Sequence, residues 1–502
     1  MDTFAELKEL VRIVSDRIPE RSPYLSRSEI KEGKTKHARF FRALIEDSST
    51  SESTLAHKVF GVSVDDPSYK MEKSRFRQIL MNTAFVFDLE KAKVSEPAQI
   101  EYMVRQSAFL ARTFYQRDSD AIAKNIITEV LEVALKYELW HDAMSMLCCL
   151  RNIVTYEGEV EELKKLAVEY ERIAAIEIAQ QRSLAHFGEL VAPFVRSGVE
   201  RPDLASTAEE YLRQAEDDYN RYQTYGLAAN VFRLRTAYYQ VQMMYKETLA
   251  ACDEYEALLL GRFEIFSRPT ILGEVRQKRV LCNLHLGRYE EGLAAAEAGK
   301  EVIKKGSDNW FYLRQYEFLC YSNAIRFDDA QKVIEEVRNH ERFSRQDEYL
   351  QERWKLYKMY MDYLRGTIST VVQSRDARAI LKAIPLHKND KAGLNALVYL
   401  LHMLLLLERT DKSEAINHMD AFRKYRSRYL DAKKFPAMAV FFKLLIMLEP
   451  VEFDPVRAEA KEQVILKELH AAKEDVSAGL QVVPYEWLWR KILAHLKLHP
   501  MV

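Results

Sequence analysis

Apolar residues recur along most of this chain at the spacing of about 3.6 residues that an amphipathic α-helix requires. Two such stripes follow each other between residues 121 and 154; they consist of Ile122, Ile126, Val130, Val133 and Ala134, then of Ala143, Leu147 and Leu150. This segment is therefore predicted to form two helices joined by a turn. The prolines fall between stripes of this kind, where their ring geometry favours the start or the end of a helix.

A second pattern, at longer range, groups the helices into repeated units. An aromatic or apolar turn residue is followed by a small residue three positions later, then by apolar residues four and seven positions further on. The units are Trp140/Ala143/Leu147/Leu150, Tyr245/Thr248/Cys252/Tyr255, Tyr289/Gly292/Ala296/Gly299, Phe327/Ala330/Ile334/Val337, Ile368/Val371 and Lys412/Ala415/Met419/Phe422. A turn aromatic can pack into the next hairpin, and a small residue lets paired helices approach closely. The pattern predicts a degenerate array of helical hairpins, with spacings of 38 to 44 residues from Tyr245 onward.

Two of these units resemble a known repeat family. Residues 286–303, LGRYEEGLAAAEAGKEVI, resemble the second half of a tetratricopeptide repeat (TPR), with Gly292 and Gly299 where that family usually carries alanine. Residues 326–340, RFDDAQKVIEEVRNH, match nearly as well. The units here are longer than the TPR period of about 34 residues, and the tryptophan and Leu-Gly pattern of the first TPR helix is mostly missing. The resemblance implies an all-α, TPR-like superhelix.

The chain divides, on this evidence, into three expected domains. Residues 1–95 form a small helical N-terminal module, because a first helix and three further candidate helices there are separated by polar breaks and lack the repeat pattern. Residues 96–450 form the TPR-like array. Residues 451–502 form capping helices, in which Trp487 and Trp489 are expected to close the last apolar face of the array.

Composition supports a mostly helical protein and gives no sign of a long-range charge effect. Glycine (15 residues) and proline (13) are scarce, and the net charge is −1 from 74 basic and 75 acidic residues. The five cysteines never form a CxxC pair, so we expect reduced core thiols. The N-terminus lacks a signal pattern, and the longest apolar run, 396–408, is interrupted by His402 and is shorter than the roughly 20 residues of a membrane span. We expect a cytoplasmic protein with no membrane association.

No catalytic, nucleotide or metal motif emerges from the sequence. Gly33-Lys34-Thr35 lacks the earlier glycine of a phosphate-binding loop, since position 28 is Ser28. Ser63 lacks the second glycine of a nucleophile elbow. The twelve histidines are scattered and form no HExxH motif. We therefore expect no enzyme activity, no cofactor and no metal.

The leading functional expectation is a scaffold or adaptor that binds a partner protein or peptide. The first helices of stacked hairpins commonly line a concave face that takes such a partner. The positions that the TPR resemblance places on this face are Asn230, Arg233, Gln277, Tyr312, Gln315, Arg353, Tyr357 and Tyr360. Arginine and tyrosine often dominate binding energy. For Tyr357 and Tyr360, packing in the core between units is an equally open alternative.

A second functional hypothesis concerns the N-terminal module. The segment YKMEKSRFRQIL places four basic residues near one another, which would suit a DNA-binding helix in a transcriptional regulator. They are Lys70, Lys73, Arg75 and Arg77. Against this hypothesis, Glu72 dilutes the charge, and Phe76 and Leu80 indicate that one face of the helix is buried. Nucleic acid is therefore not the expected partner.

Overall fold

Helices make up most of the part of the chain that the structure describes. The structure, a computed structural model, describes residues 3–15, 18–46, 51–86, 96–197, 204–263, 266, 269–367, 394–409, 412–430, 435–472 and 481–501, and no strand occurs among them. The chain forms two compact units, residues 1–171 and 172–502. The domain boundary expected near residue 95 falls among residues 87–95, outside the described ranges.

The first unit begins with a small module that has its own core. Its helices are α1 (Thr3–Ser15), α2 (Arg27–Glu32), α3 (Lys36–Glu46), α4 (Glu52–Leu55), which continues into a π-helical turn (Ala56–Phe60), and α5 (Pro67–Ala84). Phe40 of α3 and Phe76 of α5 are both buried, and their ring centroids lie 4.9 Å apart. The side chain of Asp66 caps α5 by accepting a hydrogen bond from the Ser68 amide at 2.8 Å.

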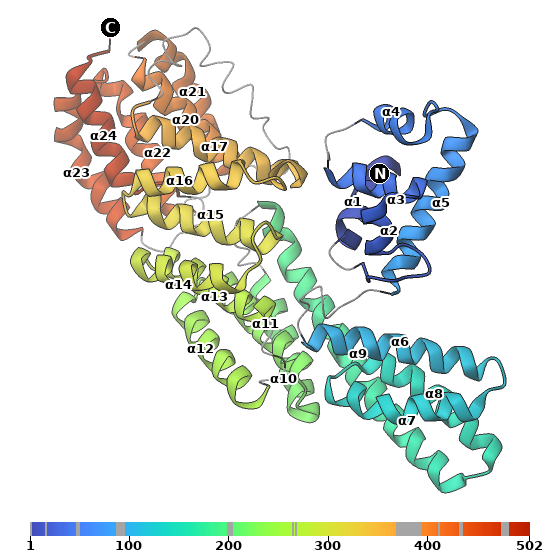
Figure 1. Ribbon diagram of the computed structural model, residues 1–502. Coiled ribbons are helices and arrows are strands. Elements are labelled where there is room, and N and C mark those ends of the chain that lie inside the picture. Colours follow the sequence, from blue (N-terminus) through green and yellow to red (C-terminus); the bar gives the residue numbers. More distant parts are fainter. Residues whose placement is uncertain are drawn as a thin grey trace. The chain divides into compact units, whose positions relative to one another are not determined.

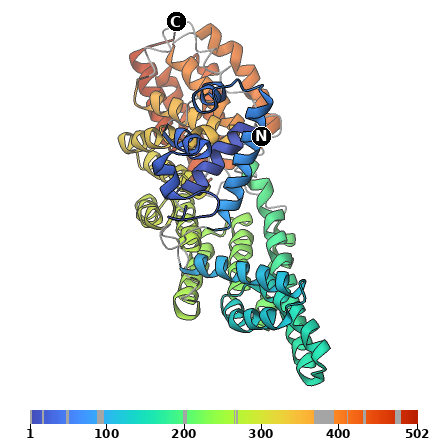
Figure 2. The same ribbon diagram turned by 45° about the vertical axis from the view of Figure 1, so that its right-hand side comes forward.

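The rest of the first unit consists of consecutive antiparallel helices. They are α6 (Glu96–Tyr115), α7 (Asp120–Lys136), α8 (Trp140–Glu157) and the start of α9 (Val160–Ser197). Figures 1 and 2 both show α6, α7 and α8, in cyan, lying side by side, and α6 contacts α8 as well as α7. The two helices predicted between residues 121 and 154 correspond to α7 and α8.

The second unit continues with paired helices along nearly its whole length. They are α10 (Ala205–Tyr222), α11 (Tyr225–Val241), α12 (Tyr245–Arg262), α13 (Pro269–His285), α14 (Tyr289–Val302), α15 (Asp308–Asn323), α16 (Phe327–Arg338), α17 (Glu348–Leu364), α20 (Leu394–Glu408), α21 (Lys412–Tyr429), α22 (Pro436–Met447), α23 (Pro455–Ala471) and α24 (Tyr485–Leu498). Neighbours in sequence pack against each other from α10 to α17, and α13 also packs directly against α15 (Figure 1).

The predicted turn positions coincide with the starts of helices. Helices α8, α12, α14, α16 and α21 begin at Trp140, Tyr245, Tyr289, Phe327 and Lys412, the residues that the repeat pattern placed in the turns. The Ile368 unit lies outside the described residues. The positions three residues further on, where the pattern has a small residue, are buried in all five helices. The repeat pattern therefore located both the hairpin turns and the close approach of the paired helices.

Four of these hairpins share one turn conformation. The residue two positions before the helix has a left-handed backbone, and these residues are Glu138 (φ 54°), Met243 (59°), Gly287 (69°) and Ile325 (62°). The next residue donates its backbone N–H to the carbonyl five residues earlier, as Arg288 does to Asn283 at 2.8 Å and Arg326 to Tyr321 at 2.9 Å. This bond occupies a carbonyl that the ending helix would leave unpaired.

One turn aromatic, Tyr245, packs into the next hairpin, as predicted, whereas Phe327 packs against α24, which is distant in the sequence. Tyr245 stacks on His285 of α13 at 4.1 Å between ring centroids, and Phe327 packs edge-on against Trp487 of α24 at 5.0 Å. Trp489 is fully buried, and its indole N–H donates to Glu462 of α23 at 2.6 Å. Both tryptophans therefore belong to the packed C-terminal end, where they were expected.

Candidate functional site

The candidate site is a hollow in the second unit, next to the first helix of a hairpin. It has a volume of about 350 Å³ and lies between α9, α11 and α13. We call it the α11 hollow; its lining includes Gln181, Leu184, Tyr225, Asn230, Arg233 and Ile271. Two of the residues predicted to bind a partner, Asn230 and Arg233, are thus brought together here.

A tight approach of two helices shapes the floor of the α11 hollow. Gly226 on α11 faces Gln180 on α9, and a Cβ atom at position 226 would lie only 2.3 Å from the Gln180 side chain. Asn230 donates to the Gln180 carbonyl at 3.1 Å and to the Ser183 hydroxyl at 2.8 Å. These bonds fix α11 against α9, so the hollow has a wall with a defined geometry.

Arg233 is held at the edge of the hollow by a carboxylate. Its guanidinium donates twice to Glu274 on α13, at 2.9 and 2.7 Å, and once to the Asn230 oxygen at 3.3 Å. Burial alone would lower the pKa of Arg233, but the hydrogen bonds and charge of Glu274 raise it. The side chains of Arg233 and Glu274 are each about a quarter exposed, so both charges are accessible to a ligand.

Aromatic rings pack beneath the same helix. Tyr225 stacks on Phe266 at 4.4 Å, and Phe232 stacks on the buried Tyr255 at the same distance. Burial raises the pKa of the Tyr255 hydroxyl well above its ordinary value. The rings rigidify the apolar side of α11, while Leu184 (46% exposed) offers aliphatic surface at the rim.

The other predicted binding residues divide into two groups. Gln277 on α13 and Tyr312 on α15 are partly exposed. Burial raises the pKa of the Tyr312 hydroxyl, opposed by the nearby Arg353 charge. Because Gln277 and Tyr312 are both partly exposed, each keeps surface that a partner could contact.

The remaining four residues lie in the interior of the unit. They are Gln315, Arg353, Tyr357 and Tyr360, each no more than 5% exposed. Arg353 donates to the Gln315 oxygen at 2.7 Å and lies 4.7 Å from the centre of the Tyr349 ring. Tyr360 donates to the Leu397 carbonyl of α20 at 2.7 Å. In this structure these four side chains pack between helices, and they offer little or no surface to a ligand.

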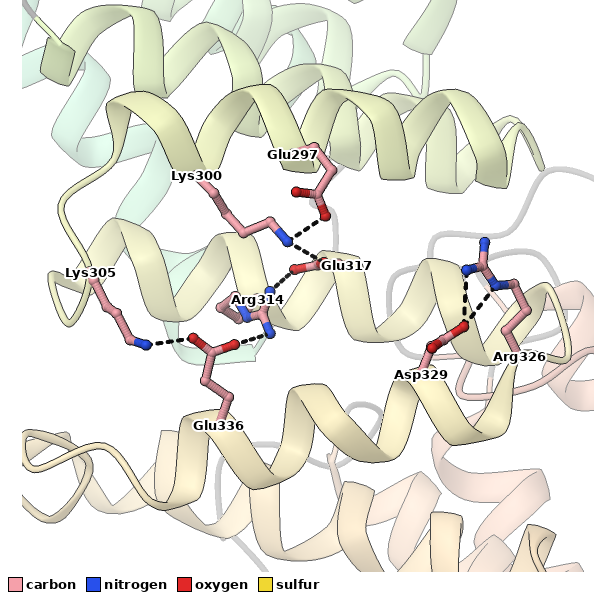
Figure 3. Close-up of polar contacts among 8 residues, drawn as sticks. All are labelled: Glu297, Lys300, Lys305, Arg314, Glu317, Arg326, Asp329 and Glu336. Carbon is pink, nitrogen blue, oxygen red and sulfur yellow. Dashed lines mark hydrogen bonds and ion pairs between the residues drawn. The ribbon is translucent and has the colours of Figure 1, made fainter.

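A network of charges that sequence reasoning missed links α14, α15 and α16 (Figure 3). Arg314 on α15 contacts Glu317 on the same helix and Glu336 on α16, the latter at 2.5 Å. Lys300 on α14 contacts Glu317 at 3.0 Å, and Lys305 contacts Glu336 at 2.7 Å. The side chains of Arg314 and Glu317 are only 5% and 2% exposed. Their spacing of three residues was the only signal available in the sequence.

The basic residues of the DNA-binding hypothesis each lie near a carboxylate. Lys73 contacts Glu52 at 2.7 Å, Arg75 contacts Glu72 at 2.9 Å, and Arg77 contacts Glu6 at 2.7 Å. The exposed Lys70 lies 3.9 Å from Asp65. Such pairing weakens the positive field that would attract a phosphate backbone.

The described residues show no arrangement typical of a metal site or a membrane span. No three histidine, cysteine or acidic side chains gather there as a metal ion would require. None of the described helices combines the length and the apolar character of a membrane span. The apolar run that forms α20 is instead buried among neighbouring helices. All five thiols are free, and four of them are buried.

Comparisons with known proteins add no assignment. Protein-family models, curated protein sequences and solved structures give no match to this chain.

Proposed function

We propose that this protein is a non-enzymatic scaffold or adaptor that binds a segment of a partner protein along the first helices of its hairpins. The observation that carries the proposal is the α11 hollow. Side-chain amides and Arg233, which is paired with Glu274, line it beside tyrosine and aliphatic surface. An extended peptide needs both kinds of group, because its backbone must form hydrogen bonds while its side chains bury apolar area.

We also propose that the helical hairpins that form the hollow belong to a TPR-like array. Support comes from the turn shared by four hairpins and from the direct packing of α13 against α15, which aligns first helices next to each other. Gln277 and Tyr312 extend the binding face along α13 and α15. Gln315, Arg353, Tyr357 and Tyr360 stiffen the helices behind it.

A cytoplasmic location is part of the same proposal. It rests on the five free cysteines, since an oxidising compartment favours disulfides.

Site-specific photo-crosslinking tests the proposal. A photoreactive residue at Leu184, which lines the hollow, is compared with one at Ile178, which lies on the same helix, is 64% exposed and does not line the hollow. In cells that express the protein, we expect the Leu184 probe to give a discrete crosslinked partner that the Ile178 probe does not give. The same crosslinks from both positions would remove the hollow from the proposal.

A further inference from the structure

A separate pocket in the first unit has a composition different from that of the α11 hollow. It has a volume of about 450 Å³ and lies where α6, α8 and α9 meet. We call it the α8 pocket; its lining includes Arg112, Tyr115, Gln116, Cys148, Asn152 and Tyr170. This volume lies within the range of about 300–1,000 Å³ that is typical of ligand pockets.

The charge of the α8 pocket is one-sided. The cation that lines it is Arg112, and no carboxylate side chain occurs among its lining residues. Arg112 has no ion pair within the described part of the chain. Arg151 does not line the pocket but lies 5.4 Å from the centre of the ring of Tyr170, which does, and it likewise has no carboxylate partner among the described residues.

In two other hollows of this protein, the basic side chains are paired with carboxylates. Arg233 in the α11 hollow is paired with Glu274. In a hollow between α21, α22 and α23, Arg423 contacts Glu449, and Lys443 contacts Glu468 at 2.8 Å. The α8 pocket therefore presents positive charge that the protein itself leaves uncompensated.

The rest of the α8 pocket suits a polypeptide. Gln116 and Asn152 supply amide groups that can pair with a peptide backbone, and Tyr115 and Tyr170 supply aromatic area. Cys148 and Tyr170 both line the pocket, and the Cys148 thiol is the main cause of the raised pKa of the Tyr170 hydroxyl. The thiol is therefore placed inside the pocket, where it can report on occupancy.

We propose that the α8 pocket binds an acidic segment of a partner protein, with Arg112 and Arg151 as the groups that recognise its carboxylates. A nucleic acid fits less well, because the turn after α8 carries the exposed Glu159 and the first turn of α9 carries the exposed Glu161 and Glu162. These carboxylates would repel a long phosphate chain but need not meet a short peptide segment. The site lies in the first unit and does not depend on the function proposed for the second.

The experiment uses the full chain and a random peptide library displayed on phage. We expect the recovered peptides to be enriched in aspartate and glutamate. A recovered peptide should bind at least about tenfold more weakly to Arg112→Glu, since a reversed charge at a recognition site costs at least about 1.4 kcal/mol. Arg117→Glu is the matched control, because Arg117 is an exposed arginine near the same end of α6 that does not line the pocket. It should leave the affinity unchanged.

A chemical readout keeps the test independent of any folding defect in the variants. Cys148 is the one partly exposed cysteine of the five. Iodoacetamide should modify it first, and the recovered peptide should protect it in the unmutated protein. Arg151→Gln serves as a second, milder variant and should also weaken binding.

Three outcomes would overturn the proposal. The recovered peptides could show no acidic enrichment, or they could leave Cys148 unprotected. Alternatively, a single-stranded oligonucleotide could displace the peptide while poly-glutamate does not, which would make the α8 pocket a site for phosphate chains.

Discussion

Gly287 and Ile325 occupy the same position in two successive hairpin turns, with φ angles of 69° and 62°. Each lies two residues before the aromatic residue that starts the second helix of its hairpin. Glycine adopts this left-handed backbone freely, whereas a β-branched residue does so at a cost of about 1–2 kcal/mol. The turn geometry is therefore imposed on Ile325 by the surrounding hairpin.

The first prediction follows from this pair. Ile325 is 38% exposed, so Ile325→Gly removes the strain but also gives up part of its packing, and we expect the free energy of unfolding to change by less than about 1 kcal/mol. The reverse change, Gly287→Ile, should lower it by about 1–2 kcal/mol, although a Cβ there meets no atom within 4 Å. Chemical denaturation measures both. A loss from Ile325→Gly as large as that from Gly287→Ile would mean that strain does not govern this turn.

A second prediction concerns the close approach of α13, α14 and α15. A Cβ atom at Gly292 would lie 2.9 Å from the Cys320 sulfur and 3.5 Å from the Asn283 Cβ. We expect Gly292→Leu to destabilise the protein by about 1–3 kcal/mol or more, because the helices must move apart. Gly188→Leu is the control, since a Cβ there meets nothing within 4 Å. Equal melting temperatures for the two variants would contradict the packing described.

The buried charges in Figure 3 give a third prediction. Arg314→Met leaves Glu317 buried with one cation fewer, so we expect a loss of about 3–5 kcal/mol in the free energy of unfolding. Adding Glu317→Met should restore part of it. Arg326→Met breaks the exposed contact with Asp329 at 2.9 Å and should cost no more than about 1 kcal/mol. A double variant whose loss is the sum of two large losses would show that Arg314 and Glu317 act independently.

Acid sensitivity provides a fourth prediction. Burial lowers the pKa of His285 from its ordinary value of 6.5 to about 3. Between pH 6.5 and about 3, His285 is protonated in the unfolded chain but neutral in the folded protein. The free energy of unfolding therefore falls as the pH drops below 6.5. The slope from this residue approaches about 1.4 kcal/mol per pH unit. Urea denaturation of His285→Phe, which can keep a ring against Tyr245, should show a weaker loss in acid.

The matched control for this effect is His57→Phe, because His57 is exposed. It should retain the acid sensitivity of the unmutated protein. An unchanged pH dependence in His285→Phe would place the acid-sensitive group elsewhere.

Much of the fold could be predicted because the repeat pattern reflects interactions between residues that are close together in the sequence. Tyr289 and Gly292 specify a turn aromatic and a close approach within a few residues of sequence, and both positions were located correctly. The candidate site was harder to predict. Arg233 pairs with Glu274, 41 residues away, and no local pattern indicates such a pairing.

The interior residues of α15 give a second reason why the candidate site was hard to predict from the sequence. This helix is buried nearly all round, so it has no polar stripe that could separate a binding face from a packed face. Polar residues such as Gln315 are accommodated there by partners from distant helices, here Arg353 of α17. A position inferred from a repeat family alone therefore cannot distinguish a groove residue from a satisfied interior one.

The central claim, that the α11 hollow binds a partner protein, is tested most directly by measuring the dissociation constant of the crosslinked partner with two variants of α9. Leu184→Asp places a charge in the hollow, and Ile178→Asp places the same charge on the same helix outside it. We expect Leu184→Asp to weaken binding by at least about tenfold with an unchanged melting temperature, and Ile178→Asp to bind as the unmutated protein does. Equal affinities of the two variants would contradict the account.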